Sequence, residues 1–180
     1  MSNPIEKSSQ SFTLEATGIL RELKTPCGIC KAYDPNTGGA HPKIEQLIGL
    51  WDTGATCSVI SKQFAEKIGL VPFKKGKVFH ADGEAIVNVY AINIFLPNHV
   101  AFSFVTVTEG KLNGFDMLIG MDIISKGDFV LSNHDGKTSF SFRVPSMEKI
   151  EFQNPKPPVK AARPRTAGSN FTPPKKKRKK

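Results

Sequence analysis

The stretch Leu50-Trp51-Asp52-Thr53-Gly54-Ala55-Thr56 places one ionisable carboxylate at the end of an apolar run and follows it at once with Thr-Gly, a turn sequence. Burying Asp52 alone inside a strand would be costly, because an unpaired charge loses its hydration there. At the mouth of a tight turn the same carboxylate is held rigidly where a cleft can form. The stretch therefore indicates a strand that delivers an acidic side chain to a turn.

A second stretch, Asp116-Met117-Leu118-Ile119-Gly120-Met121-Asp122-Ile123-Ile124, follows later in the chain, with a β-rich region between the two. A three-residue match such as Asp-Thr-Gly is common by chance, whereas two motifs in the right order are far more specific. Together they resemble the retroviral-type aspartic proteases (retropepsins), including single-domain cellular and bacterial members, over about residues 42–145. Leu118, Ile119 and Gly120 match the segment of that family, its psi-loop, that passes behind the catalytic loop.

The turn and strand signals predict a mainly β chain. Residues 11–23 have strand-like alternation, and residues 44–51 form the strand before Asp52. Hairpins are predicted where residues 77–80 and 84–96 flank Ala81-Asp82-Gly83, and where residues 129–132 and 138–144 flank Asp135-Gly136. Another strand is predicted over residues 100–108, whereas residues 25–41, rich in Gly, Pro and Asn, predict a loop.

One helix is predicted over residues 61–70, where Ser61 can cap the start and Gly69 suits a left-handed C-terminal position. Many short strands separated by turns favour an all-β barrel or sandwich. With the resemblance, the expected fold is all-β: a retropepsin-like closed acid-protease barrel with one or two short helices.

Charge and proline divide the chain into three expected parts. The net charge is +9, but residues 153–180 hold 10 basic and no acidic residues, which leaves 15 basic against 16 acidic residues in 1–152. The tail is also rich in proline, so it cannot continue a sheet. We expect an N-terminal extension with an edge strand or hairpin (1–41), a protease domain (42–150) and a disordered, basic, proline-rich tail (151–180).

The resemblance implies an aspartic endopeptidase in which two carboxylates share one proton and activate a water molecule. The chain holds one Asp-Thr-Gly, so the expected enzyme is a homodimer with catalytic Asp52 facing Asp52′ across a two-fold axis. Thr53 would tie the two loops together, Gly54 would let main-chain N–H groups approach the carboxylates, and Ala55 would supply fewer hydroxyl donors than a serine. The last feature implies a working pH nearer neutral than that of pepsin.

An extended protein or peptide substrate would lie under a flap, for which Ala81, Asp82 and Gly83 are the candidate tip. No cofactor and no catalytic metal are expected. Cys27 and Cys30 have the spacing of half a zinc site or of a thiol redox pair, with a reduced pair in a loop as the simpler alternative. Cys57 is expected to be a small buried residue.

The remaining carboxylates and the tail have simpler interpretations. Asp122 is expected to cap a helix start and Asp116 to end a loop. Residues 175–180 resemble a nuclear import signal, but weak nucleic-acid contact or a solubilising role is favoured. No signal peptide or membrane span is evident, so a cytoplasmic location is expected, or a nuclear one in a eukaryote. The competing function is a catalytically silent dimerisation and peptide-binding module of the same fold, whose basic tail contacts nucleic acid.

Overall fold

The computed structural model describes residues 8–80 and 83–152. It divides the chain into a compact body, Met1–Lys149, and a second unit, Ile150–Lys180, of which only the first three residues are described. The tail predicted at residues 151–180 therefore lies almost wholly outside the described residues. In chain order the elements are β1 (Gln10–Glu15), β2 (Lys24–Lys31), β3 (Glu45–Trp51), β4 (Val59–Ser61), α1 (Lys62–Lys67), β5 (Lys74–His80), β6 (Gly83–Phe95), β7 (Ala101–Gly110), β8 (Met117–Ile119), α2 (Met121–Ile124), β9 (Asp128–His134) and β10 (Lys137–Val144).

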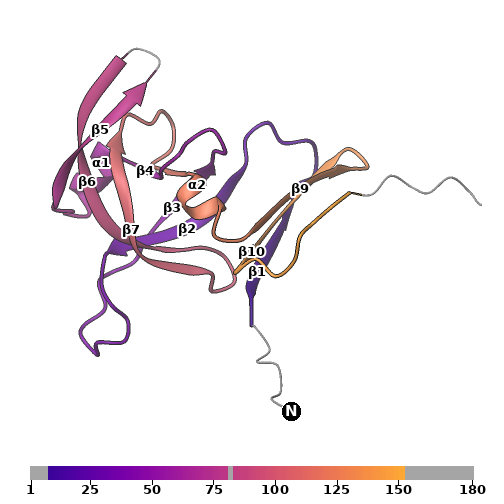
Figure 1. Cartoon of the computed structure of the whole chain (residues 1–180), viewed down its shortest axis with the longest axis horizontal. Helices are drawn as coiled ribbons and strands as arrows, with labels where there is room; N and C mark the ends of the chain where they lie inside the picture. The colour runs from indigo at the N-terminus through magenta and orange to yellow at the C-terminus, as the bar shows by residue number, and fades with distance from the viewer. Residues whose placement is uncertain (1–7, 81–82, 153–180) are drawn as a thin grey trace, which may run out of the picture. The chain divides into compact units, whose positions relative to one another are not determined.

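Six strands form a closed barrel. Their order is β2-β3-β8-β4-β7-β6, and the antiparallel pairing of β2 with β6 completes the ring. β6 pairs with β7 only from Val89 onward. Its first half, before Val89, extends beyond the barrel as a two-stranded ribbon with β5. Figure 1 shows this ribbon projecting at the upper left. The expected mainly β barrel with two short helices is confirmed.

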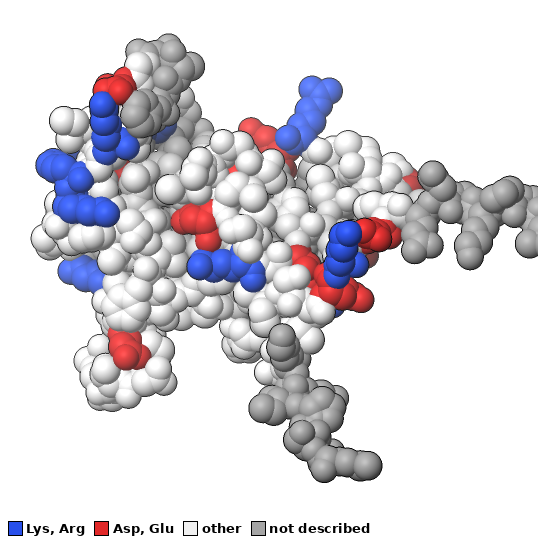
Figure 2. All heavy atoms as spheres, viewed as in Figure 1, with Lys and Arg blue, Asp and Glu red and all other residues white. Residues whose placement is uncertain are grey.

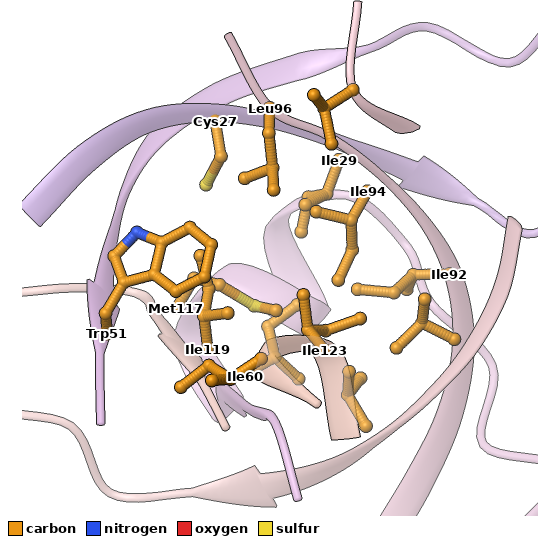
Figure 3. Close-up of a cluster of buried hydrophobic side chains, with 14 of the residues drawn as sticks. Cys27, Ile29, Trp51, Ile60, Ile92, Ile94, Leu96, Met117, Ile119 and Ile123 are labelled. Carbon is orange, nitrogen blue, oxygen red and sulfur yellow. The ribbon is translucent and has the colours of Figure 1, made fainter. Parts of the chain in front are cut away.

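The core fills the interior of this barrel. Figure 3 shows aliphatic side chains from β2, β4, β6, β8 and α2 pointing toward one another. Ile29, Ile60, Ile92, Met117 and Ile123 are fully buried. The strands alternate because successive side chains point to opposite faces, so each strand gives one apolar row to the interior. Neither helix in the described ranges is long and apolar enough to span a membrane.

A second, three-stranded sheet has the order β1-β10-β9. Its apolar face packs on Trp51, whose ring lies 5.0 Å from that of Phe140 and 5.1 Å from that of Phe142. The indole Nε1–H donates to the buried hydroxyl of Thr25 at 3.0 Å. Trp51 thus joins the second sheet to the barrel directly behind the Asp-Thr-Gly turn.

Several local predictions are confirmed. Ser61 caps α1 by accepting from the Phe64 N–H, and Gly69 has a positive φ of 65° after the helix. The two predicted hairpins form, and the turn at Asp135-Gly136 has positive φ at both residues. The loop predicted for residues 25–41 is wrong in its first part, because β2 occupies Lys24–Lys31. Tertiary pairing with β3 and β6 outweighs the turn-forming tendency of Pro26 and Gly28 there.

The position of Trp51 gives a direct test of the join between the two sheets. Replacing Trp51 with alanine removes the buried ring and leaves the Thr25 hydroxyl without its donor, so the free energy of unfolding should fall by about 3–5 kcal/mol. Urea unfolding followed by circular dichroism measures the change. The control variant Phe73→Ala, at a ring that is 57% exposed, should stay within about 0.5 kcal/mol of wild type. Equal losses in both variants would contradict the assigned packing.

Candidate active site

Asp52 lies in the turn that leaves β3. Its side-chain Oδ1 accepts from the Gly54 N–H at 2.8 Å, and its carbonyl accepts from the Ala55 N–H at 3.3 Å. Asp52 and Ala55 are half-buried, whereas Thr53 and Gly54 are exposed. The turn therefore presents a carboxylate at the surface of the body with one oxygen fixed by the main chain.

This turn is fastened on one side to β8 and on the other to the start of α2. The Asp52 N–H donates to the Ile119 carbonyl at 3.0 Å, and the Met121 N–H donates to the Ala55 carbonyl at 2.8 Å. β3 runs parallel to β8 with Trp51 opposite Ile119, and β4 runs antiparallel on the other side with Val59 opposite Leu118. The psi-loop residues predicted from sequence are thus brought against the predicted catalytic turn.

Gly120 makes this close approach sterically feasible. A Cβ atom built at Gly120 would lie 2.7 Å from the Cys57 carbonyl carbon and 2.9 Å from the Ala55 carbonyl oxygen. Both neighbours are main chain, so they cannot move aside as a flexible side chain would. The position therefore requires glycine, because any side chain would push β8 away from the turn.

Ser58 is a part of the site that the sequence predictions missed. It is completely buried, accepts from the Gly120 N–H at 3.1 Å and donates to Asp122 Oδ1 at 2.8 Å. The signal was present in the sequence, because a hydroxyl within the apolar run Ala55–Ile60 needs a buried partner.

Asp116 is likewise hydrogen-bonded to a serine, Ser61, at the other end of β4. The Ser61 hydroxyl donates to Asp116 Oδ1 at 2.6 Å, and the Ser61 N–H donates to the Asp116 carbonyl at 2.9 Å. Asp116 immediately precedes β8, as predicted. The prediction that Asp122 caps a helix start is wrong, because the N-cap of α2 is Gly120 and Asp122 lies inside the first turn. Asp116 and Asp122 thus each accept from a serine hydroxyl, whereas the Asp52 carboxylate accepts only from a main-chain N–H among the bonds of this region.

Of the predicted flap residues, the structure describes only Gly83, at the start of β6. Gly83 begins β6 with a φ of 126°, a conformation that favours glycine. Ala81 and Asp82 are outside the described residues. The inner face of the ribbon, with Ala85 and Val87, lines a cavity of about 550 Å³ whose other walls come from α1 and from residues 109–113.

A hydrogen-bonded carboxylate lies in that cavity wall. Glu109 Oε2 accepts from the Tyr90 hydroxyl at 2.6 Å and from Asn88 Nδ2 at 2.8 Å. Desolvation raises the pKa of Glu109, but the two donors together with Lys62 and Lys75 outweigh it, so the pKa lies below its usual value. Burial and the Glu109 carboxylate raise the pKa of Tyr90 to about 12. The cavity wall therefore carries a fixed negative charge at neutral pH.

The cysteines do not lie where the sequence suggested. Cys27 and Cys30 are buried in strand β2 rather than in a loop, and Cys57 is exposed rather than buried. Cys57 follows the Asp52 turn at the surface, and the neighbouring Ser58 takes the buried position. No group of three metal-ligating side chains occurs in the described ranges, 8–80 and 83–152.

Ser58→Ala tests whether the turn depends on its hydroxyl. The change leaves the buried Gly120 N–H without an acceptor and Asp122 without a donor, so the free energy of unfolding should fall by about 1–3 kcal/mol. Urea denaturation measures it, with the exposed Ser132→Ala as the control. An unchanged midpoint for Ser58→Ala would show that the turn is held without this hydroxyl.

Thiol reactivity tests whether Cys27 and Cys30 are buried and Cys57 is exposed. Burial raises the pKa of the Cys27 thiol to about 12, and burial also raises that of Cys30. Both thiols therefore stay protonated at pH 8 and should react slowly with a disulfide reagent in the native protein, whereas Cys57 should react fast. One rapid thiol per chain is expected, and Cys57→Ser should remove it. Three rapid thiols would contradict the assigned burial.

Comparison with known proteins found one family model and several similar solved structures. Residues 45–126 match the family model described as "gag-polyprotein putative aspartyl protease". No curated protein matches. Similar solved structures include a retropepsin-like aspartic protease from Rickettsia conorii, with 12% identity, a TM-score of 0.47, and coverage of 78% of this chain and 99% of that chain. Simian Foamy Virus (mac) protease has 17% identity, a TM-score of 0.38, and coverage of 57% and 92%. EIAV protease complexed with the inhibitor HBY-793 has 15% identity, a TM-score of 0.41, and coverage of 69% and 92%.

The matched segment contains both halves of the candidate site. It begins with β3, includes the turn at Asp52 and the whole of β8, and ends just after α2. Over residues 45–126 the chain is therefore similar to a family of putative aspartyl proteases.

Proposed function

We propose that the protein is an aspartic endopeptidase whose catalytic acid is Asp52. One observation carries this proposal: Asp52 is half-buried in a turn fastened by main-chain bonds to Ile119 of β8 and Met121 of α2, with Oδ1 held by the Gly54 N–H. Such a turn holds a carboxylate still while leaving it accessible to water and substrate. The nearby Asp116 and Asp122 are committed to serine hydroxyls, so neither competes for the role.

The reaction needs a base for water and an acid for the scissile carbonyl. Two carboxylates held close together provide both, because they cannot ionise together and share one proton. This chain supplies one Asp-Thr-Gly, so the second carboxylate is proposed to be Asp52′ of a second copy. A two-fold axis then makes both halves of the site from one motif, with Thr53 and Ala55 of each copy beside it.

The chain offers a strand through which a second copy could pair near the turn. β9 has β10 on one side and no strand partner on the other within the described residues. Its Phe129 ring lies 5.8 Å from Trp51, the residue before Asp52. An open edge strand can pair with its own copy by main-chain hydrogen bonds. This edge supports the proposed dimer because its Phe129 packs against the residue that precedes Asp52.

The β5–β6 ribbon is the proposed flap, with Ala81, Asp82 and Gly83 at its tip. It projects beyond the barrel, and Ala85 and Val87 on its inner face line the cavity beside α1. An extended peptide with apolar side chains suits such a wall, and closure of the ribbon would exclude water during the reaction. The chemistry uses an activated water and requires no cofactor.

Asp52→Asn tests the catalytic role. The variant keeps the turn's hydrogen bond but cannot share a proton, so cleavage of a denatured protein should fall to background. The control Asp135→Asn changes a carboxylate that is 83% exposed in the β9–β10 turn and should leave cleavage unchanged. Equal inactivity of wild type, control and variant would contradict the enzyme and favour a silent binding module.

Mixing the two proteins tests the shared dyad. If both carboxylates must be intact, equal amounts of wild type and Asp52→Asn at constant total protein should give about one quarter of the activity, because subunits pair at random. A fall to one half would indicate an independent active monomer.

The pH–rate profile of the wild type should peak above pH 4, because Ala55 supplies fewer hydroxyl donors to the carboxylates than a serine would.

A further inference from the structure

The outer side of β5 is an open sheet edge. β5 is the last strand of its sheet and pairs only with β6, from Lys74 opposite Val89 to His80 opposite Gly83. No other main-chain partner for β5 occurs among the described residues. The strand therefore offers a row of N–H and C=O groups to an added strand.

This edge is strongly basic although the body as a whole is nearly neutral. Five exposed lysines lie on α1 and β5, and the only acidic residue in residues 62–77 is Glu66; the lysines are Lys62, Lys67, Lys74, Lys75 and Lys77. Figure 2 shows lysine side chains gathered at the left, where Figure 1 places β5, β6 and α1. Local charge, rather than net charge, decides what this edge attracts.

The face of the ribbon that carries Lys75 and Lys77 combines these charges with an apolar contact. Lys77 lies opposite Ile86, and Lys75 lies opposite Asn88, so all four share one face. Ile86 is 77% exposed. Lys75, Lys77 and Ile86 line a shallow groove together with Glu84, which forms an exposed ion pair with Lys77. An exposed ion pair of this kind contributes little to stability, so an incoming carboxylate can replace Glu84 with little loss of free energy.

We propose that β5 is a docking edge for an extended acidic peptide segment, which adds to the sheet as a further strand. Acidic side chains at every second position would lie beside Lys75 and Lys77, because residues i and i+2 of a strand point to one face. Main-chain hydrogen bonds supply affinity, and the alternating charges supply selectivity. Lysines on an open edge also disfavour neutral strands, which leaves an acidic strand as the partner that fits.

The chain's own tail is excluded as the occupant by charge. Residues 153–180 contain 10 basic and no acidic residues, so they are repelled by the lysines of β5. A nucleic acid would also be attracted by the charge, but it has no N–H and C=O ladder to match the open edge. The peptide is favoured because it uses both features of β5.

The docked segment would belong to a protein substrate, and in that respect the inference rests on the proposed function. β5 forms the outer strand of the proposed flap, whereas cleavage takes place at Asp52. Docking would raise the local concentration of a nearby cleavable segment without touching the reacting bond. Substrates are therefore expected to carry an alternating acidic stretch apart from the cleaved sequence.

Binding to the full-length Asp52→Asn protein tests docking without cleavage. The probe is a fluorescent ten-residue peptide with glutamate at every second position and threonine between, measured by anisotropy at about 150 mM salt, where long-range attraction is screened. Lys75→Glu/Lys77→Glu should weaken binding at least about fivefold, because two attractions become repulsions. The matched control Lys126→Glu/Lys137→Glu makes the same change in net charge elsewhere on the surface and should bind like the parent. The tail is present in every variant, so it contributes equally to the peptide binding measured for each.

Two altered probes separate strand addition from simple charge attraction. The same peptide N-methylated at every residue keeps its charge but has no main-chain N–H group to donate to a strand edge, so its binding should also fall at least about fivefold. A single-stranded oligonucleotide of equal charge should compete poorly. Undiminished binding of the methylated peptide, equal competition by the oligonucleotide, or equal effects of the two double variants would overturn the proposal. Docking that persists in a wild-type protein without protease activity would instead contradict the proposed function alone.

Discussion

The insertion of β8 between β3 and β4 is the constraint on which the candidate site depends. β3 enters the Asp52 turn and β4 leaves it, so a strand that pairs with both fixes the turn at its two ends. The main-chain bonds from Asp52 to Ile119 and from Met121 to Ala55 then set how far the turn stands above the barrel. Without this strand, residues 52–58 would be a surface loop free to adopt many conformations, and fixing them would cost entropy at every residue.

Buried hydroxyl–carboxylate pairs reinforce the same region. Ser58 with Asp122 and Ser61 with Asp116 lie at opposite ends of the short β4 strand. The serine hydroxyls are buried and the carboxylates partly buried, so losing either hydrogen bond would be costly, and both bonds form only when β4 and β8 are in register. The polar pairs therefore specify one alignment of two three-residue strands, whose own ladder of hydrogen bonds is too short to do so.

Charged side chains are distributed unevenly over the molecule, which its overall composition does not show. Residues 1–152 are almost neutral, yet the lysines of α1 and β5 gather at one edge while Glu109 is held inside the neighbouring cavity wall. The ribbon thus has a basic open edge along β5, with Lys75 and Lys77 on one face, whereas Ala85 and Val87 on the opposite face line the cavity. The division arises because alternate residues of β5 and β6 point to opposite faces.

The sequence by itself determined the local features: the turn at Asp52, the capped helix at Ser61, the hairpin turn at Asp135-Gly136 and the mainly β character. Each follows from interactions within a few residues, such as a side-chain cap or a positive φ. Only the tertiary structure decided that residues 24–31 form a barrel strand, that Ser58 rather than Cys57 faces inward, and that Asp122 bonds to Ser58 instead of capping α2. Those outcomes depend on segments some 20 to 65 residues apart in the chain, whose pairing is set by the packing of the whole barrel rather than by local preference.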